Sequence, residues 1–251
     1  MKDSAEIHVS RSNPTETSPN PSTRWFEWAG GADGGVVRYY DKPSQEVVTV
    51  GEKFAFLLLD ELATVKGWHD ASDSGIYANE VRDTRQDVMV VRSFKGGELA
   101  SGLYSQIRDR VGNFGGHFVA SCYIAYKDGD TYRIGNIGFK GAALNAWVEF
   151  KKSCGMKNGR KAFYVDAVKI DGFEEGKKGR VVYRVPKFHL APISDEANTQ
   201  AVALDTELQE FLSEYLRRAR VEQAEATKAE RPVKAEAASV DPEFADDDIP
   251  F

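Results

Sequence analysis

Aromatic and basic side chains occur together in several short segments whose residues alternate as in β-strands. Arg38 and Tyr40 share one face of an expected strand, and Arg92 and Phe94 share a face of another. Cations contact phosphate groups and flat rings stack on nucleobases, so this combination is typical of a surface that binds a single-stranded nucleic acid. The candidate contacts of this kind are Trp25, Arg38, Tyr40, Arg92, Phe94, Lys95, Tyr123, Arg133 and Lys140.

A group of four acidic residues and one histidine is a second candidate for chemistry, because clustered carboxylates could hold the metal of a nuclease. Two of them end an expected strand, and others lie in a loop-like segment at 70–75, where acidic residues are ordinary. No Ser/His/Asp or Cys/His arrangement has a recognisable context. We therefore expect a binding protein with no metal, no cofactor and no catalytic residue. The residues of this group are Asp60, Glu61, His69, Asp70 and Asp73.

The end of the chain combines negative charge with one aromatic residue. Three carboxylates can engage a basic surface, Pro250 restricts the approach of the last residue, and Phe251 can fill a pocket while its α-carboxylate binds an arginine. A merely solubilising tail has no need for the Ile-Pro-Phe ending. The sequence therefore predicts a protein-binding tail formed by Asp246, Asp247, Asp248, Ile249, Pro250 and Phe251.

The formal net charge of −6 is confined to this end of the chain. All 33 basic residues lie within residues 1–234, together with 33 of the 39 acidic residues, and the six remaining carboxylates follow. A body without net charge can still carry a basic face. An acidic segment attached to such a body is typical of an interaction tail.

The last six residues, Asp-Asp-Asp-Ile-Pro-Phe, resemble the acidic tip of bacterial single-stranded DNA-binding proteins, and a similar ending occurs in phage proteins of this kind. Residues 54–81 resemble phage-encoded single-stranded DNA-binding proteins with an elaborated OB-fold. The opening strand of the bacterial proteins and their Gly/Gln/Pro linker are absent. The resemblance implies an OB barrel, no catalysis, and a role in DNA replication, recombination and repair. It also implies that the tail recruits replication or recombination proteins; it does not fix the oligomeric state.

The elements that must position these residues are mainly β-strands. Short β-branched or aromatic runs separated by glycine predict a barrel or a sandwich. With the resemblance, we expect a β-barrel of the elaborated OB-fold type with a few helices. Trp68 and Trp147 are expected in the core, and residues 156–161 in a basic loop. The expected strands are residues 25–28, 36–40, 54–59, 88–94, 117–126, 131–139, 163–170 and 181–188, and the expected helices lie within 99–111, 144–148 and 194–220.

Five regions follow from this pattern. Residues 1–23 are rich in Pro, Ser and Thr and predict a flexible, disordered arm, and residues 24–193 predict the OB-like DNA-binding domain. Residues 194–220 predict an amphipathic helix with Ser194 as its N-cap. Residues 221–240 predict a linker, and 241–251 predict the disordered acidic tail.

The sequence also limits the location of the protein. It has no apolar stretch long enough for a membrane span and no secretory leader pattern, and its two cysteines, Cys122 and Cys154, form no metal or disulfide motif. We expect a protein of the bacterial host cytoplasm that coats single-stranded DNA independently of sequence. Two alternatives stay open: a metal-dependent nuclease or other DNA-processing enzyme with the same tail, and an adaptor that binds no DNA.

Overall fold

The computed structural model describes residues 19–229, with the backbone alone described at 155–164 and 222–229. This part of the chain is mainly β, as the sequence predicts, and contains eleven strands and three α-helices. The first strands are β1 (Arg24–Ala29), β2 (Val36–Asp41), β3 (Glu46–Gly51), β4 (Lys53–His69), β5 (Ser74–Ala78), β6 (Met89–Ser93) and β7 (Gly97–Gly102). The later strands are β8 (Gly116–Asp128), β9 (Thr131–Lys140), β10 (Ala167–Lys178) and β11 (Val181–Ala191), and the helices are α1 (Tyr104–Asn113), α2 (Gly141–Val165) and α3 (Asp195–Ala229).

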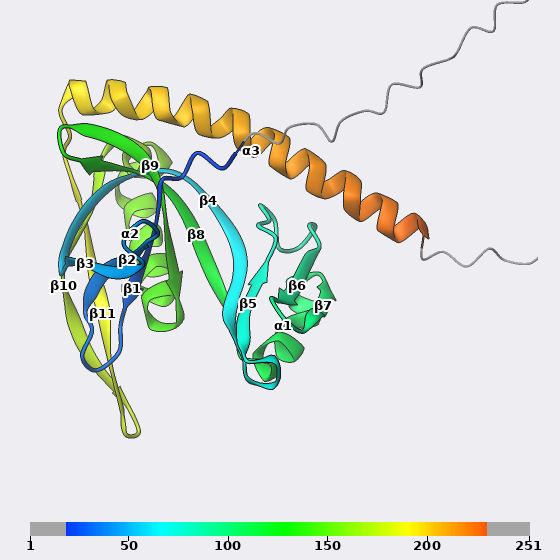
Figure 1. The fold of residues 1–251 in the computed structure, drawn as a ribbon. Helices are drawn as coiled ribbons and strands as arrows, with labels where there is room; N and C mark the ends of the chain where they lie inside the picture. The colour runs from blue at the N-terminus through cyan, green and yellow to red at the C-terminus, as the bar shows by residue number, and fades with distance from the viewer. Residues whose placement is uncertain (1–18, 230–251) are drawn as a thin grey trace, which may run out of the picture.

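All of these strands belong to one sheet in the order β3-β2-β1-β9-β8-β4-β5-β6-β7, and the β10–β11 hairpin pairs with β4. The pairings are antiparallel except that of β1 with β9. Among the described strands, no pairing joins the two ends of this order, so the sheet is open and the expected closed barrel is not seen. The long strands β4 and β8 curve from a body formed with β1–β3 and α2 into a lobe formed by β5–β7 and α1 (Figure 1).

Three apolar clusters hold these parts together. The largest lies between the sheet and α2 around Trp147, which is fully buried as expected. A second lies beneath α3, where Leu208 and Leu212 pack on β4, β8 and β9. The third fills the lobe around Met89 and Val111. Because β8 has apolar residues on both faces, it is covered from both sides and offers few positions to a ligand.

Helix α3 agrees with the sequence at its start and differs at its end. The Ser194 Oγ accepts a hydrogen bond from the Ala197 backbone N–H at 3.2 Å, which is the expected N-cap contact. Buried Leu208 and exposed Val202 show the expected amphipathic character. The helix continues to Ala229, so residues 221–229, expected as part of a linker, are helical. Residues 230–251, with the rest of the linker and the acidic tail, lie outside the described residues.

Other boundaries also differ from the sequence expectations. Leu99, expected in a helix, lies in β7, and α1 begins only at Tyr104. The chain turns between the two elements at Gly102, which has a φ of +147°. Residues 156–161, expected as a basic loop, form part of α2. The expected arm is described from residue 19, and the Thr23 backbone N–H donates to the Ile134 carbonyl at 2.8 Å, so contact with the sheet begins before β1. Residues 1–18 lie outside the described part.

Asp60 links the sheet to α3 and makes stability depend on pH. Burial alone would raise the pKa of Asp60, but hydrogen bonds from Arg82 at 2.7 and 2.9 Å, from Gln209 at 3.0 Å and from the Glu61 backbone hold it below its ordinary value. A carboxyl whose pKa is lowered by folding stabilises the fold above its unfolded pKa of about 3.9, and this contribution is lost as the pH falls through the folded value.

We therefore expect Asp60→Asn to lower the free energy of unfolding at pH 6 and to flatten its decrease below pH 4. Urea unfolding of both proteins at pH 6 and at acidic pH measures this difference. A variant that loses stability in parallel with the parent on acidification would show that Asp60 does not carry the pH dependence.

Candidate nucleic-acid interface

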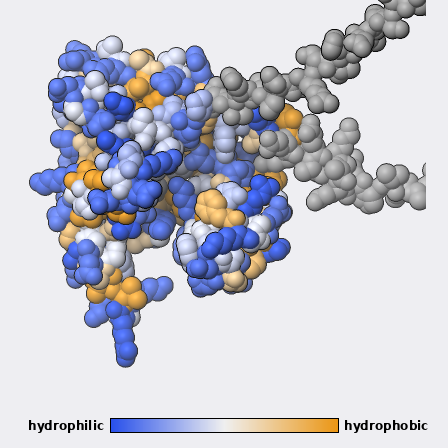
Figure 2. Space-filling view, viewed as in Figure 1, coloured by the Kyte–Doolittle hydropathy of each residue, from blue (hydrophilic) through white to orange (hydrophobic). Residues whose placement is uncertain are grey.

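A groove of about 860 Å³ crosses the sheet between the body and the lobe. Figure 2 shows these two parts separated by a hollow. One wall comes from β1 and β2, the opposite wall from the end of β4 with β5 and the turn after β6, and the floor from β8, β9 and β4. The side chains used below are those of Trp25, Tyr40, Lys66, Trp68, Tyr77, Phe94, His117 and Lys140.

The walls of this groove carry five aromatic rings that reach solvent. Trp25 and Tyr40 are 41% and 56% exposed on the body wall, and Trp68, Tyr77 and Phe94 are 54%, 38% and 74% exposed on the lobe wall. A soluble chain normally buries rings of this size, and a gathering of exposed ones marks a binding surface. The structure therefore places flat apolar faces on both sides of one groove.

Two rings of the lobe wall, those of Tyr77 and Phe94, lie nearly parallel to each other. Tyr77 and Phe94 stack with ring centroids 4.6 Å apart and an interplanar angle of 27°. Gly75 allows this arrangement, since a Cβ at this position would lie 3.2 Å from the Phe94 ring. The backbone N–H of Phe94 also donates to the Gly75 carbonyl at 3.1 Å, which fixes the residue beyond the end of β6.

Polar residues form a row across the floor and the lobe. His117, Lys66, Tyr77 and Arg92 are successive partners in the pairing of β8, β4, β5 and β6. Directly paired residues point to the same face of a sheet, so the imidazole, the ammonium and the guanidinium follow one line that includes the Tyr77 ring. Lys140 joins the groove from the end of β9. This row provides positive charge along the path that an extended, negatively charged ligand would follow between the two walls.

Lys66 has the most perturbed environment in the groove. Its side chain is reached by solvent, but the surrounding walls remove much of the water around the ammonium group and lower the pKa of Lys66. The carboxylates of Glu80 and Glu27 oppose this shift, and Lys140 adds to it. A phosphate bound beside Lys66 would raise the pKa of Lys66 again, because its negative charge stabilises the ammonium form.

Most of the residues expected from the sequence lie in or beside the groove. Trp25, Tyr40, Phe94 and Lys140 line it, and Lys42 places its Nζ 5.2 Å from the Trp25 ring centroid as a further cation. Three more of the expected residues lie beside the groove. Arg38 lines an adjoining hollow and forms an ion pair with Glu27 at 2.7 Å, and Arg92 lies 3.9 Å from Glu98. The Lys95 Nζ donates a hydrogen bond to the Asp73 carbonyl at 3.1 Å.

Two expected contacts lie elsewhere. Tyr123 is 1% exposed beneath α3 and its hydroxyl donates to Glu80 at 2.6 Å; burial and this carboxylate raise the pKa of Tyr123. Its ring belongs to the core, because β8 is covered on both faces. Arg133 binds Asp128 at 3.1 Å near the far end of β9, about 23 Å along the strand from Lys140. It does not line the groove.

The structure also adds residues that the sequence did not single out. Trp68, expected in the core, is exposed in the lobe wall, and Lys66 and Tyr77 were not expected to bind a ligand. The available signal was the alternation of Lys66 and Trp68 on either side of Gly67: a lysine two residues from a tryptophan in a strand indicates a face that solvent reaches.

The groove continues into a second hollow of about 560 Å³ along β1 and the turn between β1 and β2. Glu27, Trp28, Val47 and Lys140 line both spaces. Beyond them the second hollow is lined by the backbone of the glycine-rich turn at 30–34. A ligand that enters between the aromatic walls can therefore extend towards this turn.

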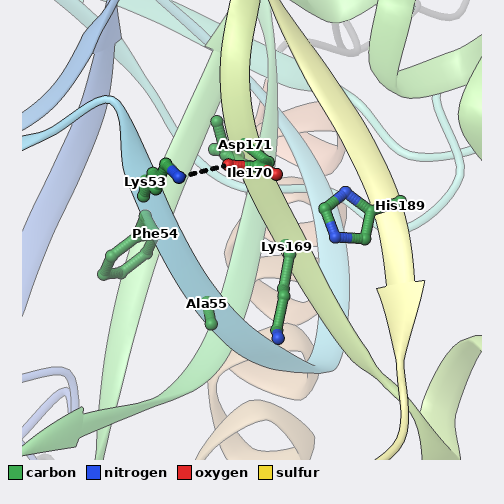
Figure 3. Close-up of a pocket in the computed structure, with 7 residues that line it drawn as sticks. All are labelled: Lys53, Phe54, Ala55, Lys169, Ile170, Asp171 and His189. Carbon is green, nitrogen blue, oxygen red and sulfur yellow. Dashed lines mark ion pairs between the residues drawn. The ribbon is translucent and has the colours of Figure 1, made fainter.

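A separate hollow of about 380 Å³ lies on β4, β10 and β11 (Figure 3). Lys53, Lys169 and His189 give it basic character, but Lys53 forms an ion pair with Asp171 at 3.2 Å. It shares no lining residue with the groove. Phe54 and the imidazole of His189 are the two rings among its lining residues, so this hollow offers less for stacking than the five exposed rings of the groove do.

The acidic residues considered for a metal site have other partners. Asp60 binds Arg82 and Gln209, and Glu61 accepts hydrogen bonds from Lys151 at 2.6 Å and from the Trp147 indole at 3.0 Å. Within the described part of the chain, no three His, Cys, Asp or Glu side chains are grouped as a metal site requires. In the same part, none of the helices combines the length and apolar character needed to cross a membrane.

The expected partner-binding tail, residues 246–251, lies outside the described residues. No protein-family model, curated protein or solved structure matches the chain. The groove and the sequence of the tail are therefore the features that bear on the function of the protein.

Proposed function

We propose that this protein binds single-stranded DNA independently of sequence, as a phage-type protein of DNA replication, recombination and repair. The observation that carries the proposal is the groove, in which exposed rings on two walls face each other across a floor with cations. Bases stack on rings with about 1–3 kcal/mol each, and every base has a flat face. This arrangement suits any base sequence.

The groove favours a single strand over a duplex for a physical reason. In a duplex the base faces are stacked on each other, so rings such as Trp25 and Trp68 can reach them only after unpairing. In a single strand the bases are free to lie between the walls while the phosphates approach Lys66 and Lys140. Coating by many copies would then protect exposed strands and remove hairpins.

We also propose that the open sheet is an elaborated OB-type fold. OB-folds are partly open and bind oligonucleotides on the faces of their strands and on flanking loops. The groove has comparable elements, since strands form its floor, the turn after β6 belongs to one wall, and the groove continues into a hollow lined by the turn at 30–34. The resemblance of residues 54–81 to phage proteins with this fold supports the assignment.

The acidic tail completes the proposal. Its carboxylates and its final phenylalanine suit a basic pocket on replication or recombination proteins, which the coated strand would thereby recruit. Such a role places the protein in the cytoplasm of a bacterial host.

Gel shifts with single- and double-stranded oligonucleotides of the same sequence, with and without magnesium, test this function. We expect a shift of the single strand that magnesium does not alter, and a weaker shift of the duplex. Degradation that requires magnesium would instead indicate a nuclease, and the absence of any shift would indicate an adaptor.

Charge removal at the floor gives a quantitative prediction. We expect Lys66→Gln and Lys140→Gln each to weaken binding equally for all base sequences. Each should also reduce the slope of log K against log salt concentration by about 0.7, because one phosphate contact on a single strand is lost. Arg133→Gln is the matched control and should leave the slope unchanged. Equal effects of Arg133→Gln and Lys66→Gln would contradict the position of the groove.

A further inference from the structure

The β10–β11 hairpin projects from the sheet beside the end of the groove. β10 pairs with β4 only over Val168–Asp171, and from Phe173 to Lys178 it pairs with β11 alone. The outer part of the hairpin beyond Arg184, residues 176–178 and their partners, extends about 10 Å. It forms the spike at the bottom of Figures 1 and 2.

The base of this hairpin is fixed to the turn that lines the second hollow. The Arg184 backbone N–H donates to the Gly30 carbonyl at 2.8 Å, and its guanidinium donates to the Gly34 carbonyl. The Trp28 indole N–H donates to the Arg184 carbonyl at 2.9 Å, and the Arg184 guanidinium lies 4.7 Å from the Phe173 ring centroid. The hairpin is therefore held as a continuation of the end of the groove.

Positive charge is concentrated at the hairpin tip. The carboxylates nearer the base are balanced, since Glu174 lies 3.3 Å from Lys187 and Glu175 lies 3.9 Å from Arg184. The tip carries Lys177, Lys178 and Arg180, all exposed. Among the described residues, none of these three cations has a carboxylate within 4.0 Å. The tip thus carries three unbalanced charges within four residues.

We propose that the hairpin tip binds the phosphates of the same single strand where it leaves the groove. This inference rests on the proposed function of the groove and adds a second, purely electrostatic subsite. Tyr183 is turned towards Gly176, where a Cβ would lie 2.5 Å from its ring, and Val181 is the exposed large apolar side chain near the tip. With no exposed ring among the described residues of the tip, the contact is made to phosphates and not to bases.

The test compares a short and a long oligo-dT with the full-length protein and a variant carrying Lys177→Gln, Lys178→Gln and Arg180→Gln. The short oligonucleotide is the minimal length that the parent protein binds, so that it fills the groove alone. We expect its affinity to be unchanged in the variant. For the long oligonucleotide we expect about tenfold weaker binding at low salt and a salt slope reduced by about 2.

Glu174→Gln with Lys187→Gln is the matched control, because it removes one ion pair of the same hairpin and leaves its net charge unchanged. It should bind both lengths as the parent does. Unchanged binding of the long oligonucleotide by the triple variant would overturn the proposal, as would an equal loss for both lengths. The triple variant is also titrated with a duplex that carries a short single-stranded end. If the variant binds this duplex more weakly than the parent does but binds both oligo-dT lengths normally, the tip contacts duplex DNA and the proposal is overturned. Failure of the parent protein to bind oligo-dT would refute the proposed function itself.

Discussion

Replacing Trp25 and Trp68 together by alanine is expected to weaken binding of oligo-dT by at least about 30-fold. The two rings lie on opposite walls of the groove, and each stacked base contributes about 1–3 kcal/mol. Loss of both therefore removes at least about 2 kcal/mol, and each 1.4 kcal/mol is a factor of ten in affinity. Titration of fluorescent oligo-dT with the parent, single and double variants measures this effect.

Three controls separate stacking from other causes. The slope of affinity against salt should not change, because the tryptophans contact no phosphate. Trp25→Phe keeps a ring at the body wall and should retain most of the affinity. The double variant should unfold at nearly the temperature of the parent, since both side chains are exposed. A loss of affinity accompanied by unfolding would show that these rings serve the core.

The sequence predicted the residues of the body wall better than those of the lobe wall. Trp25 and Tyr40 lie in short strands at one end of the sheet order, where alternation along the strand suffices to identify an exposed face. Tyr123 fails because α3, about 80 residues later in the chain, covers its face of β8. Alternation along one strand cannot reveal a helix that arrives from so far away.

Trp68 shows the opposite error. A large apolar residue is normally buried, and nothing local distinguishes it from Trp147, which is buried beside α2. The difference lies in β4, which runs for 17 residues and passes from the body into the lobe. The sequence pattern predicts a strand that ends at residue 59, so it does not predict that the segment carrying Trp68 belongs to the sheet.

Whether the sheet closes depends on pairings between strands that are far apart in the sequence. The turn between β8 and β9 is local: Gly129 has a φ of +65° and Asp128 pairs with Thr131, as a short hairpin predicts. The parallel pairing of β1 with β9 and the pairing of β4 with β10 join residues more than 100 positions apart. Patterns within a strand carry no information on such partners, so the amount of strand could be predicted and the closure of the sheet could not.

Deleting the acidic tail, residues 241–251, is expected to tighten binding of oligo-dT by about tenfold at low salt, with a smaller gain at high salt. Six carboxylates beyond Lys234 carry the whole formal net charge, and five of them lie in the deleted segment. This segment is polyanionic like DNA, so it competes for the cations of the groove. The 22 residues after Ala229 can span at most about 70 Å, which limits how far the tail reaches from the end of α3. Because the competition is electrostatic, salt weakens it over a Debye length of about 8–10 Å.

The same deletion is expected to abolish recruitment of replication or recombination proteins, and Phe251→Ala alone should do so too. The single ring anchors the tail in a partner pocket, whereas charge alone gives little specificity. Since Phe251→Ala keeps all the carboxylates, its affinity for DNA should stay within about twofold of the parent. The two functions of the tail are thus separable by one side chain.

Titrating full-length, tail-deleted and Phe251→Ala proteins with oligo-dT at two salt concentrations tests the competition, and capture of partners from host extract by the same three proteins tests recruitment. If the tail-deleted protein binds DNA at low salt no more tightly than the full-length protein, the tail does not occupy the groove. If Phe251→Ala instead tightens DNA binding as much as the deletion does, the phenylalanine itself lies against the exposed rings of the groove. Partner recognition and occupation of the groove would then depend on the same residue.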